Sequence, residues 1–218
     1  MFKHIIFDCD GVLIDSEIVA AEVMARWMRE QGMSISTEQF IQTHTGKTFS
    51  GIIRECIAEN LLPADIDVHA GMTVIETEVK ANIRPVTGVA AGLAEITKPK
   101  SVVSNSGVAY IQKAVDDFEI SHHFEGRLFS SEMVAAPKPS PLVYELAVEK
   151  IALPKSEILV IEDSLTGVQA AKAAGLSVWG FLGGSHILPG HGGKMLQAGV
   201  SALVEDYGEL NEKLKPLL

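Results

Sequence analysis

The sequence has few cysteines and no long apolar segment, and each absence excludes a class of protein. Its two cysteines, Cys9 and Cys56, do not form a C-x-x-C pair, so a zinc site or a redox couple has no support. Two isolated thiols are typical of a reducing cytosol. The apolar run Ile5–Phe7 is far too short for a signal peptide or a membrane span. We therefore expect a cytoplasmic protein.

The chain also lacks a cluster of basic residues. Its formal net charge is −10, and no run of lysine and arginine supplies the basic face with which nucleic-acid binders collect phosphates. Nucleic acid is therefore not an expected partner. The same charge would repel an anionic metabolite, so a phosphate site must take its positive field from a cation, a lysine or helix N-termini.

Short apolar runs separated by helical patterns dominate the sequence from Lys100 onward. Ser106 and Ser140 each precede a helical pattern, and Ser164 is predicted to cap a third that ends at Gly175. Such alternation predicts an α/β fold with a parallel sheet covered on both faces. The predicted strands, rich in β-branched or aromatic residues, are His4–Asp8, Lys100–Ser104, Arg127–Ser130, Ile158–Glu162 and Ser177–Phe181, with a weaker sixth at Ala202–Glu205.

A helical segment interrupts this alternation after the first strand. Glu17–Gln31 has a helical pattern, and the four residues from Ser36 to Gln39 form the pattern of a capping box that opens another helix. No convincing strand follows in this segment. We therefore predict a discontinuous α/β core, residues 1–14 and 85–218, with an all-helical domain inserted at residues 15–84.

Paired carboxylates follow two of the predicted strands, where open parallel sheets bind ligands. Asp8 and Asp10 lie two residues apart, which suits a hard cation and leaves one carboxylate for attack and one for proton transfer. A calcium loop is disfavoured, because Val12 occupies the place of its third ligand. Glu162 and Asp163 lie at the C-terminal end of another strand, and adjacent carboxylates are unfavourable there unless a cation shares them. The alternative for either pair is an acidic turn.

Two further segments carry groups that suit a phosphate. Ser104 and Asn105 lie at the end of a strand, and with nearby backbone N–H groups they would hold phosphate oxygens. The alternative, which this segment alone favours, is a helix cap. Lys138 lies between Pro137 and Pro139, which keep its backbone extended and rigid. It is either a fixed cation beside a phosphate or a solvated lysine in a turn.

Together the four segments resemble the haloacid dehalogenase-like hydrolases, in the subgroup with a helical cap after the first motif. The sequence matches the family's D-x-D-G-[TV]-[LV]-x-D-[ST]-E opening at residues 8–17, its hydrophobic-[ST] motif ending at residue 104, its K-P motif at residue 138 and its E-D-S-x-x-G-[VI] motif at residues 162–168. The resemblance covers nearly the whole chain. It implies a Rossmann-like parallel sheet core, with residues 15–84 as an inserted all-helical cap domain.

The resemblance also implies roles for the acidic residues. Asp8 would be the nucleophile that takes the phosphoryl group. Asp10 would be the general acid for the leaving alcohol and then the general base for the hydrolytic water. Asp8, the carbonyl of Asp10 and Asp163 would bind magnesium, Mg²⁺, with Glu162 in or near its shell.

The other matched residues would hold the substrate. Ser104, Asn105 and Lys138 would bind the phosphate oxygens, and the cap residues Thr45 and Lys47 would contact the leaving group. We therefore expect a magnesium-dependent phosphatase that acts on a small phosphorylated metabolite such as a sugar phosphate. The sequence leaves the oligomeric state open between a monomer and a weak dimer.

Other members of the family remain as alternatives. A sugar phosphomutase of the β-phosphoglucomutase type shares the four motifs, but that subgroup carries a cap histidine where this chain has Ala20. A dehalogenase normally lacks the counterpart of Asp10, and a phosphonatase would use a cap lysine such as Lys47. A non-catalytic binding module is disfavoured by the intact set of charged residues. His186 and His191 lie in a Gly-rich loop and are interpreted as polar residues near the rim of the site.

Overall fold

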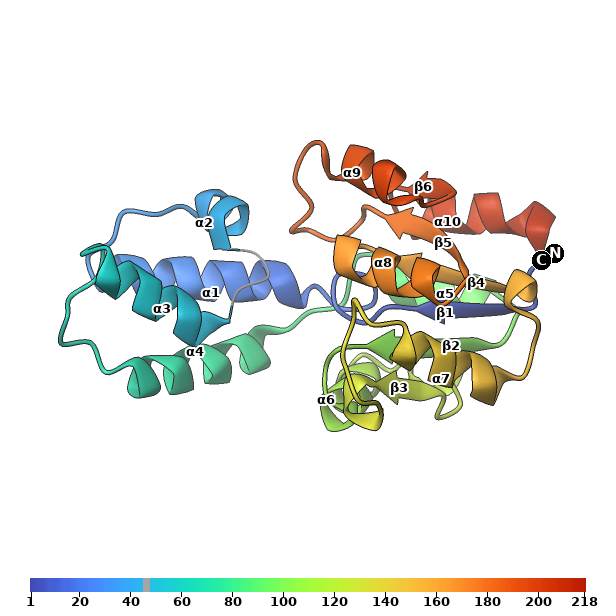
Figure 1. The fold of residues 1–218 in the computed structure, drawn as a ribbon, viewed down its shortest axis with the longest axis horizontal. Coiled ribbons are helices and arrows are strands. Elements are labelled where there is room, and N and C mark those ends of the chain that lie inside the picture. Colours follow the sequence, from blue (N-terminus) through green and yellow to red (C-terminus); the bar gives the residue numbers. More distant parts are fainter. Residues whose placement is uncertain (45–47) are drawn as a thin grey trace. The chain divides into compact units, whose positions relative to one another are not determined.

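The computed structural model describes residues 1–44 and 48–218, and the chain divides into two compact units (Figure 1). Unit 1 comprises Met1–Ile14 and Pro85–Leu218, and unit 2 comprises Asp15–Arg84. Ile14 pairs with Pro85 in an antiparallel bridge, and the N–H of Asp15 donates to the carbonyl of Arg84 at 2.8 Å. The two connections between the units therefore run side by side. In the described part of the chain, no helix has the length and apolar character needed to cross a membrane.

Unit 1 is built on a six-stranded, wholly parallel sheet, which confirms the predicted α/β fold. All six predicted strands are present, with ends that differ by at most one residue from those predicted. Their short apolar runs form strands because the sheet is buried on both faces. The strands are β1 (His4–Phe7), β2 (Lys100–Ser104), β3 (Leu128–Ser130), β4 (Ile158–Glu162), β5 (Ser177–Phe181) and β6 (Ala202–Val204).

The order of the strands positions the site. The sheet runs β3-β2-β1-β4-β5-β6, so the chain moves outward from β1 in one direction and then in the other. Phe7 on β1 is in register with Val102 on β2 and with Ile161 on β4. The carboxyl ends of these three strands therefore meet at a topological switch point, where open α/β sheets bind ligands.

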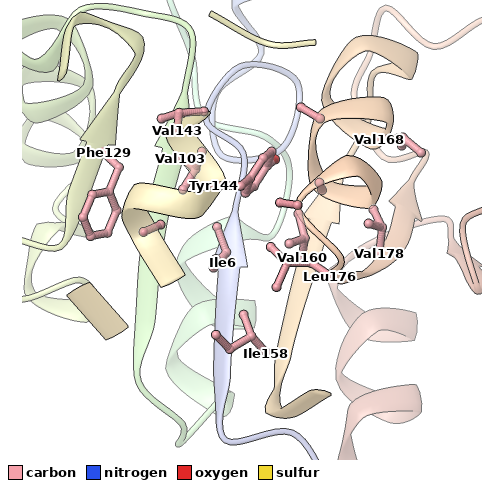
Figure 2. Packing of buried hydrophobic residues seen from close by; sticks show 14 of the residues in the cluster. Ile6, Val103, Phe129, Val143, Tyr144, Ile158, Val160, Val168, Leu176 and Val178 are labelled. Atoms are coloured by element: carbon pink, nitrogen blue, oxygen red, sulfur yellow. The ribbon is translucent and has the colours of Figure 1, made fainter. Parts of the chain in front are cut away.

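Helices α7 (Leu142–Ile151), α8 (Leu165–Ala173) and α9 (His191–Ala198) cover one face of this sheet. Strand residues on this face, among them Ile6 and Val160, pack against Tyr144 and Val168 of the helices (Figure 2). The hydroxyl of Ser164 accepts the N–H of Gly167 at 3.0 Å, which confirms the predicted cap of α8.

Other strand residues are buried on the opposite face, where Phe7 meets Phe124 edge-on at 6.5 Å between ring centroids. Helix α5 (Val89–Glu95) packs closely against helix α10 (Tyr207–Leu214), so that a Cβ at Gly92 would overlap the ring of Tyr207. The remaining elements of unit 1 are α6 (Val108–Asp117) and the 3₁₀ turns Ser121–His123, Ser131–Met133, Lys155–Glu157 and Lys215–Leu217.

Unit 2 has an apolar core of its own between helices. The N–H of Ser36 donates to Gln39 Oε1 at 2.8 Å, and the N–H of Gln39 donates to Ser36 Oγ at 3.1 Å, which confirms the predicted capping box. A Cβ at Gly71 would lie 2.7 Å from the ring of Trp27, so glycine at this position lets the helix that carries Gly71 approach the helix that carries Trp27. The described helices of unit 2 are α1 (Ser16–Glu30), α2 (Thr37–His44), α3 (Phe49–Ala58) and α4 (Val68–Asn82).

A buried histidine, His4, links the stability of unit 1 to pH. The side chain is 3% exposed, and its Nε2 hydrogen-bonds the Ser101 hydroxyl at 3.0 Å. Burial, together with the charges of Arg127 and Lys100, lowers the pKa of His4 from 6.5 to about 4. The neutral ring therefore stabilises the fold fully above about pH 6.5, and this contribution is lost as the pH falls towards about 4.

We predict that lowering the pH from 7.5 to 5 destabilises the wild-type protein by about 2 kcal/mol more than a His4→Gln variant, from the linkage between proton binding and folding. Urea unfolding at both pH values, followed by circular dichroism, measures the two free energies of unfolding. The other titrating groups are common to both proteins, so their effects cancel. An equal loss of stability in the two proteins would contradict this role of His4.

Candidate active site

Gly11 shapes the loop that follows β1 and carries Asp8 and Asp10. Its N–H donates to the carbonyl of Ile14 at 2.7 Å, which closes the loop into a tight turn. Gly11 has a φ of +79°, and an added Cβ would overlap the carboxylate of Asp163. Both the backbone conformation and the close approach of Asp163 therefore require glycine.

Lys138 is the cation of the site. Its Nζ donates to Asp8 Oδ1 at 2.6 Å, to Glu162 Oε1 at 2.7 Å and to the carbonyl of Val103 at 2.9 Å. The lysine side chain is 4% exposed. Burial works against its charge, but the carboxylates of Asp8 and Glu162 raise the pKa of Lys138 well above its usual value. The lysine is therefore charged and fixed by three acceptors.

Both carboxylate oxygens of Glu162 accept hydrogen bonds. Its Oε1 accepts from Lys138 and from the hydroxyl of Tyr144 at 3.0 Å, and its Oε2 accepts from the N–H and the hydroxyl of Ser164, both at 3.1 Å. The Lys138 ammonium also lies 4.9 Å from the centroid of the Tyr144 ring. Glu162 thus ties the lysine to α7 and to the start of α8.

Negative charge exceeds positive charge at the end of β1 and β4. One carboxylate oxygen from each of Asp8, Glu162 and Asp163 lies within 4.8 Å of the others, and all three side chains are buried. Burial and the Glu162 carboxylate raise the pKa of Asp8 well above its ordinary value, against the opposing charge of Lys138. A divalent cation would relieve this repulsion, and a set of buried carboxylate oxygens suits one with a preference for oxygen ligands.

Asp10 has different surroundings. Its Oδ2 accepts from the hydroxyls of Ser106 at 2.7 Å and Ser104 at 3.3 Å, and its Oδ1 accepts from the hydroxyl of Tyr110 at 3.3 Å. The hydroxyl of Ser106 therefore binds Asp10 and does not cap α6, whose N-cap residue is Gly107. The two aspartates of the opening motif are thus held by different partners.

The segment that carries Lys138 is fastened to the end of β2 by Asn105. The side-chain amide of Asn105 donates to the carbonyl of Lys138 at 3.2 Å, and its Oδ1 accepts the N–H of Lys138 at 2.8 Å. Through these two hydrogen bonds the Asn105 side chain orients the backbone of Lys138. Thr45 and Lys47, predicted to contact the leaving group, lie outside the described residues.

A model of the family of haloacid dehalogenase-like hydrolases matches residues 5–181, which is most of the chain. The protein belongs to this family. The resemblance carried by the four motifs is therefore confirmed.

Curated relatives and a solved structure of this hydrolase family agree with the assignment. The 6-phosphogluconate phosphatase of Escherichia coli (strain K12) is 25% identical over 199 residues, which cover 86% of each protein. The fructose-1-phosphate phosphatase YqaB of the same organism is 25% identical over 181 residues, covering 80% of this chain and 94% of the relative. A haloacid dehalogenase-like protein of unknown function from Agrobacterium tumefaciens has a similar structure, with a TM-score of 0.87, 28% identity and coverage of 100% of this chain and 99% of its own.

The sequence does not predict three contacts of the acidic residues: those of Ser106 and Tyr110 with Asp10, and that of Tyr144 with Glu162. Tyr144 lies among the apolar residues of a predicted helix, and a buried tyrosine usually finds a hydrogen-bond partner for its hydroxyl. This position therefore indicates a polar contact of Tyr144 in the core.

We predict opposite effects on stability for alanine at two helical glycines of this hydrolase. A Cβ at Gly167 in α8 would overlap the carboxylate of Glu162, so Gly167→Ala must displace that side chain and is expected to lower the free energy of unfolding by about 1–3 kcal/mol. An added Cβ at Gly193 in α9 would meet no atom of another described element within 4 Å, so Gly193→Ala is expected to raise the free energy of unfolding by about 0.5 kcal/mol. Chemical denaturation of both variants measures the difference. A Gly167→Ala protein as stable as Gly193→Ala would refute the close packing at Glu162.

Proposed function

We propose that this hydrolase is a magnesium-dependent phosphatase that removes the phosphate group of a small phosphorylated metabolite, in the first instance a sugar phosphate, through a phosphoaspartyl intermediate. The observation that carries the proposal is the convergence of Asp8, Lys138 and Asp163 in one buried cluster at the switch point of the sheet. The names of the relatives support the substrate class, since they are phosphatases of 6-phosphogluconate and fructose 1-phosphate.

The charges of the site suit an attack on a phosphate by a carboxylate. Asp8 and a substrate phosphate repel one another, and two unit charges about 4 Å apart cost roughly 4 kcal/mol at an effective dielectric constant near 20. The Lys138 ammonium, 2.6 Å from Asp8, offsets this repulsion and is placed to stabilise charge on the phosphate oxygens. A bound cation adds a second positive charge.

Magnesium would be held by the acidic residues at the ends of β1 and β4. Asp8, the carbonyl of Asp10 and Asp163 would be its protein ligands, and Glu162 would lie beside them while it holds Lys138. When bound, the ion neutralises charge on the phosphoryl oxygens and orients the substrate. The cluster of buried carboxylates supports this placement because it needs a cation to offset its charge.

The reaction then proceeds in two steps. A carboxylate oxygen of Asp8 attacks phosphorus, the bond from phosphorus to the substrate oxygen breaks, and Asp10 donates a proton to the departing alcohol. In the second step Asp10 takes a proton from a water molecule that attacks the phosphoryl group. The bond between phosphorus and Asp8 breaks, which releases inorganic phosphate and restores the carboxylate.

The other predicted residues have supporting roles in this scheme. Lys138, Ser104 and Asn105 bind phosphate oxygens, and the Asn105 side chain also orders the lysine segment. The helical unit Asp15–Arg84 would act as a lid that excludes water, as lids of active sites commonly do. Thr45 and Lys47, which belong to this segment of the chain, would contact the leaving group.

We predict that Asp8→Asn abolishes phosphate release while the protein stays folded, because the amide is nearly isosteric with the carboxylate but a very poor nucleophile. Inorganic phosphate released from a panel of sugar phosphates with magnesium is the measurement. The matched control is Asp117→Asn, at an exposed aspartate paired with Lys113 on α6, and this variant is expected to retain full activity.

Chelation of the metal is expected to remove activity, and added magnesium is expected to restore it. Turnover by a folded Asp8→Asn protein, or full activity after exhaustive chelation, would refute the proposal.

We also predict hydrolysis in place of isomerisation. Ala20 stands where the mutase subgroup carries a cap histidine, and its methyl group cannot form a hydrogen bond or exchange a proton. The enzyme is to be incubated with β-glucose 1-phosphate, magnesium and a bisphosphate activator, and both products measured. Release of inorganic phosphate without glucose 6-phosphate is expected of a phosphatase. Rapid formation of glucose 6-phosphate with little phosphate release would assign the chain to the mutase alternative.

A further inference from the structure

Two histidines of one loop segment reach the same residue of the acidic cluster, Asp163. His186 lies in the loop between β5 and α9, and its Nε2 is 3.2 Å from Asp163 Oδ2. His191, the first residue of α9, places its Nε2 2.6 Å from the backbone carbonyl of Asp163. The segment therefore contacts both the side chain and the main chain of one proposed metal ligand.

The ring of His186 sits against two glycines that leave room for it. A Cβ at Gly11 would lie 2.8 Å from His186 Cε1, and a Cβ at Gly184 would lie 3.0 Å from both Cε1 and Nδ1 of the same ring. The side chain of His186 is 12% exposed, and that of Asp163 is 4% exposed. The contact between His186 and Asp163 is thus largely shielded from water and sterically defined on two sides.

The acceptors of Asp163 determine which ring nitrogens carry a proton. An ionised carboxylate and a backbone carbonyl can only accept hydrogen bonds. An unprotonated imidazole nitrogen facing either group would be repelled. Nε2 of His186 and Nε2 of His191 must therefore both be N–H donors. Each ring does this in its neutral form, so neither contact requires a charged histidine.

We propose that His186 and His191 are positioning residues that fix Asp163 so that its carboxylate faces the metal site, an inference that rests on the proposed function. His191 fixes the backbone of Asp163 and His186 orients its side chain. Hydrogen bonds to the groups that ligate a metal commonly change metal affinity by about 10–100-fold when they are removed. The Gly-rich loop that carries His186 therefore contributes to cation binding without contacting the reacting atoms.

Direct binding of Mn²⁺ to the full chain, followed by electron paramagnetic resonance without substrate, tests this inference separately from turnover. His186→Leu removes the donor and is expected to weaken Mn²⁺ binding by about 10–100-fold. His186→Gln keeps an N–H donor of similar reach and is expected to retain most of the affinity. His122→Leu, on an exposed histidine, is the matched control and is expected to bind as the wild type does.

Asp163→Asn separates the failure of this inference from that of the proposed function. If Asp163→Asn weakens Mn²⁺ binding and His186→Leu does not, the positioning role is wrong and the metal site stands. If the wild type does not bind Mn²⁺, or Asp163→Asn leaves binding unchanged, the proposed metal site fails and the inference fails with it.

A measurement on the wild-type protein tests the geometry even if His186→Leu does not fold. Nitrogen-15 NMR of the imidazole rings reports which nitrogen of each histidine is protonated. A proton on Nε2 of His186 and of His191 is the expected result. An unprotonated Nε2 on His186 would overturn the proposal, because that nitrogen could not donate to Asp163.

Discussion

The buried ammonium of Lys138 is the interaction on which the rest of the site depends. It lies 2.6 Å from Asp8 and 2.7 Å from Glu162, and removing one partner from a buried ion pair is strongly destabilising because the other charge is left uncompensated. Glu162 is held in turn by Tyr144 and by Ser164. Tyr144 belongs to the apolar cluster between the sheet and its helices (Figure 2), so the packing of the core fixes the lysine that faces the nucleophile.

The sheet supplies the second constraint. Because the strand order reverses at β1, the residues that follow β1 and β4 are brought together although more than a hundred positions separate them in sequence. This arrangement brings three buried carboxylates together, and two of them, Asp8 and Glu162, are paired with Lys138. Such a cluster is unfavourable by itself and favourable with a cation, and this repulsion is the physical basis of the metal dependence that we propose.

Much of the fold, and the grouping of Asp8, Lys138 and Asp163, could be predicted from the sequence because both depend on local patterns. Short apolar runs predict the strands, and the order of the motifs predicts that these three residues lie at the carboxyl edge of the sheet. The contacts of Tyr144 and His186 were not predictable, since they are set by packing between elements. The contact of Asn105 with the lysine segment illustrates the same limit: its side-chain amide bonds the backbone of a residue 33 positions away, which no local pattern encodes.

The central claim is that Asp8 carries the phosphoryl group during turnover. The most direct test is a rapid acid quench of the wild-type enzyme with a hydrolysed sugar phosphate and magnesium, followed by mass spectrometry of its peptides. The account predicts one phosphoryl group on the peptide that contains Asp8, formed as fast as the alcohol is released and absent from Asp8→Asn. Phosphate release at the full rate with no phosphoryl group on Asp8 at any quench time, or with the group on another residue, would contradict it.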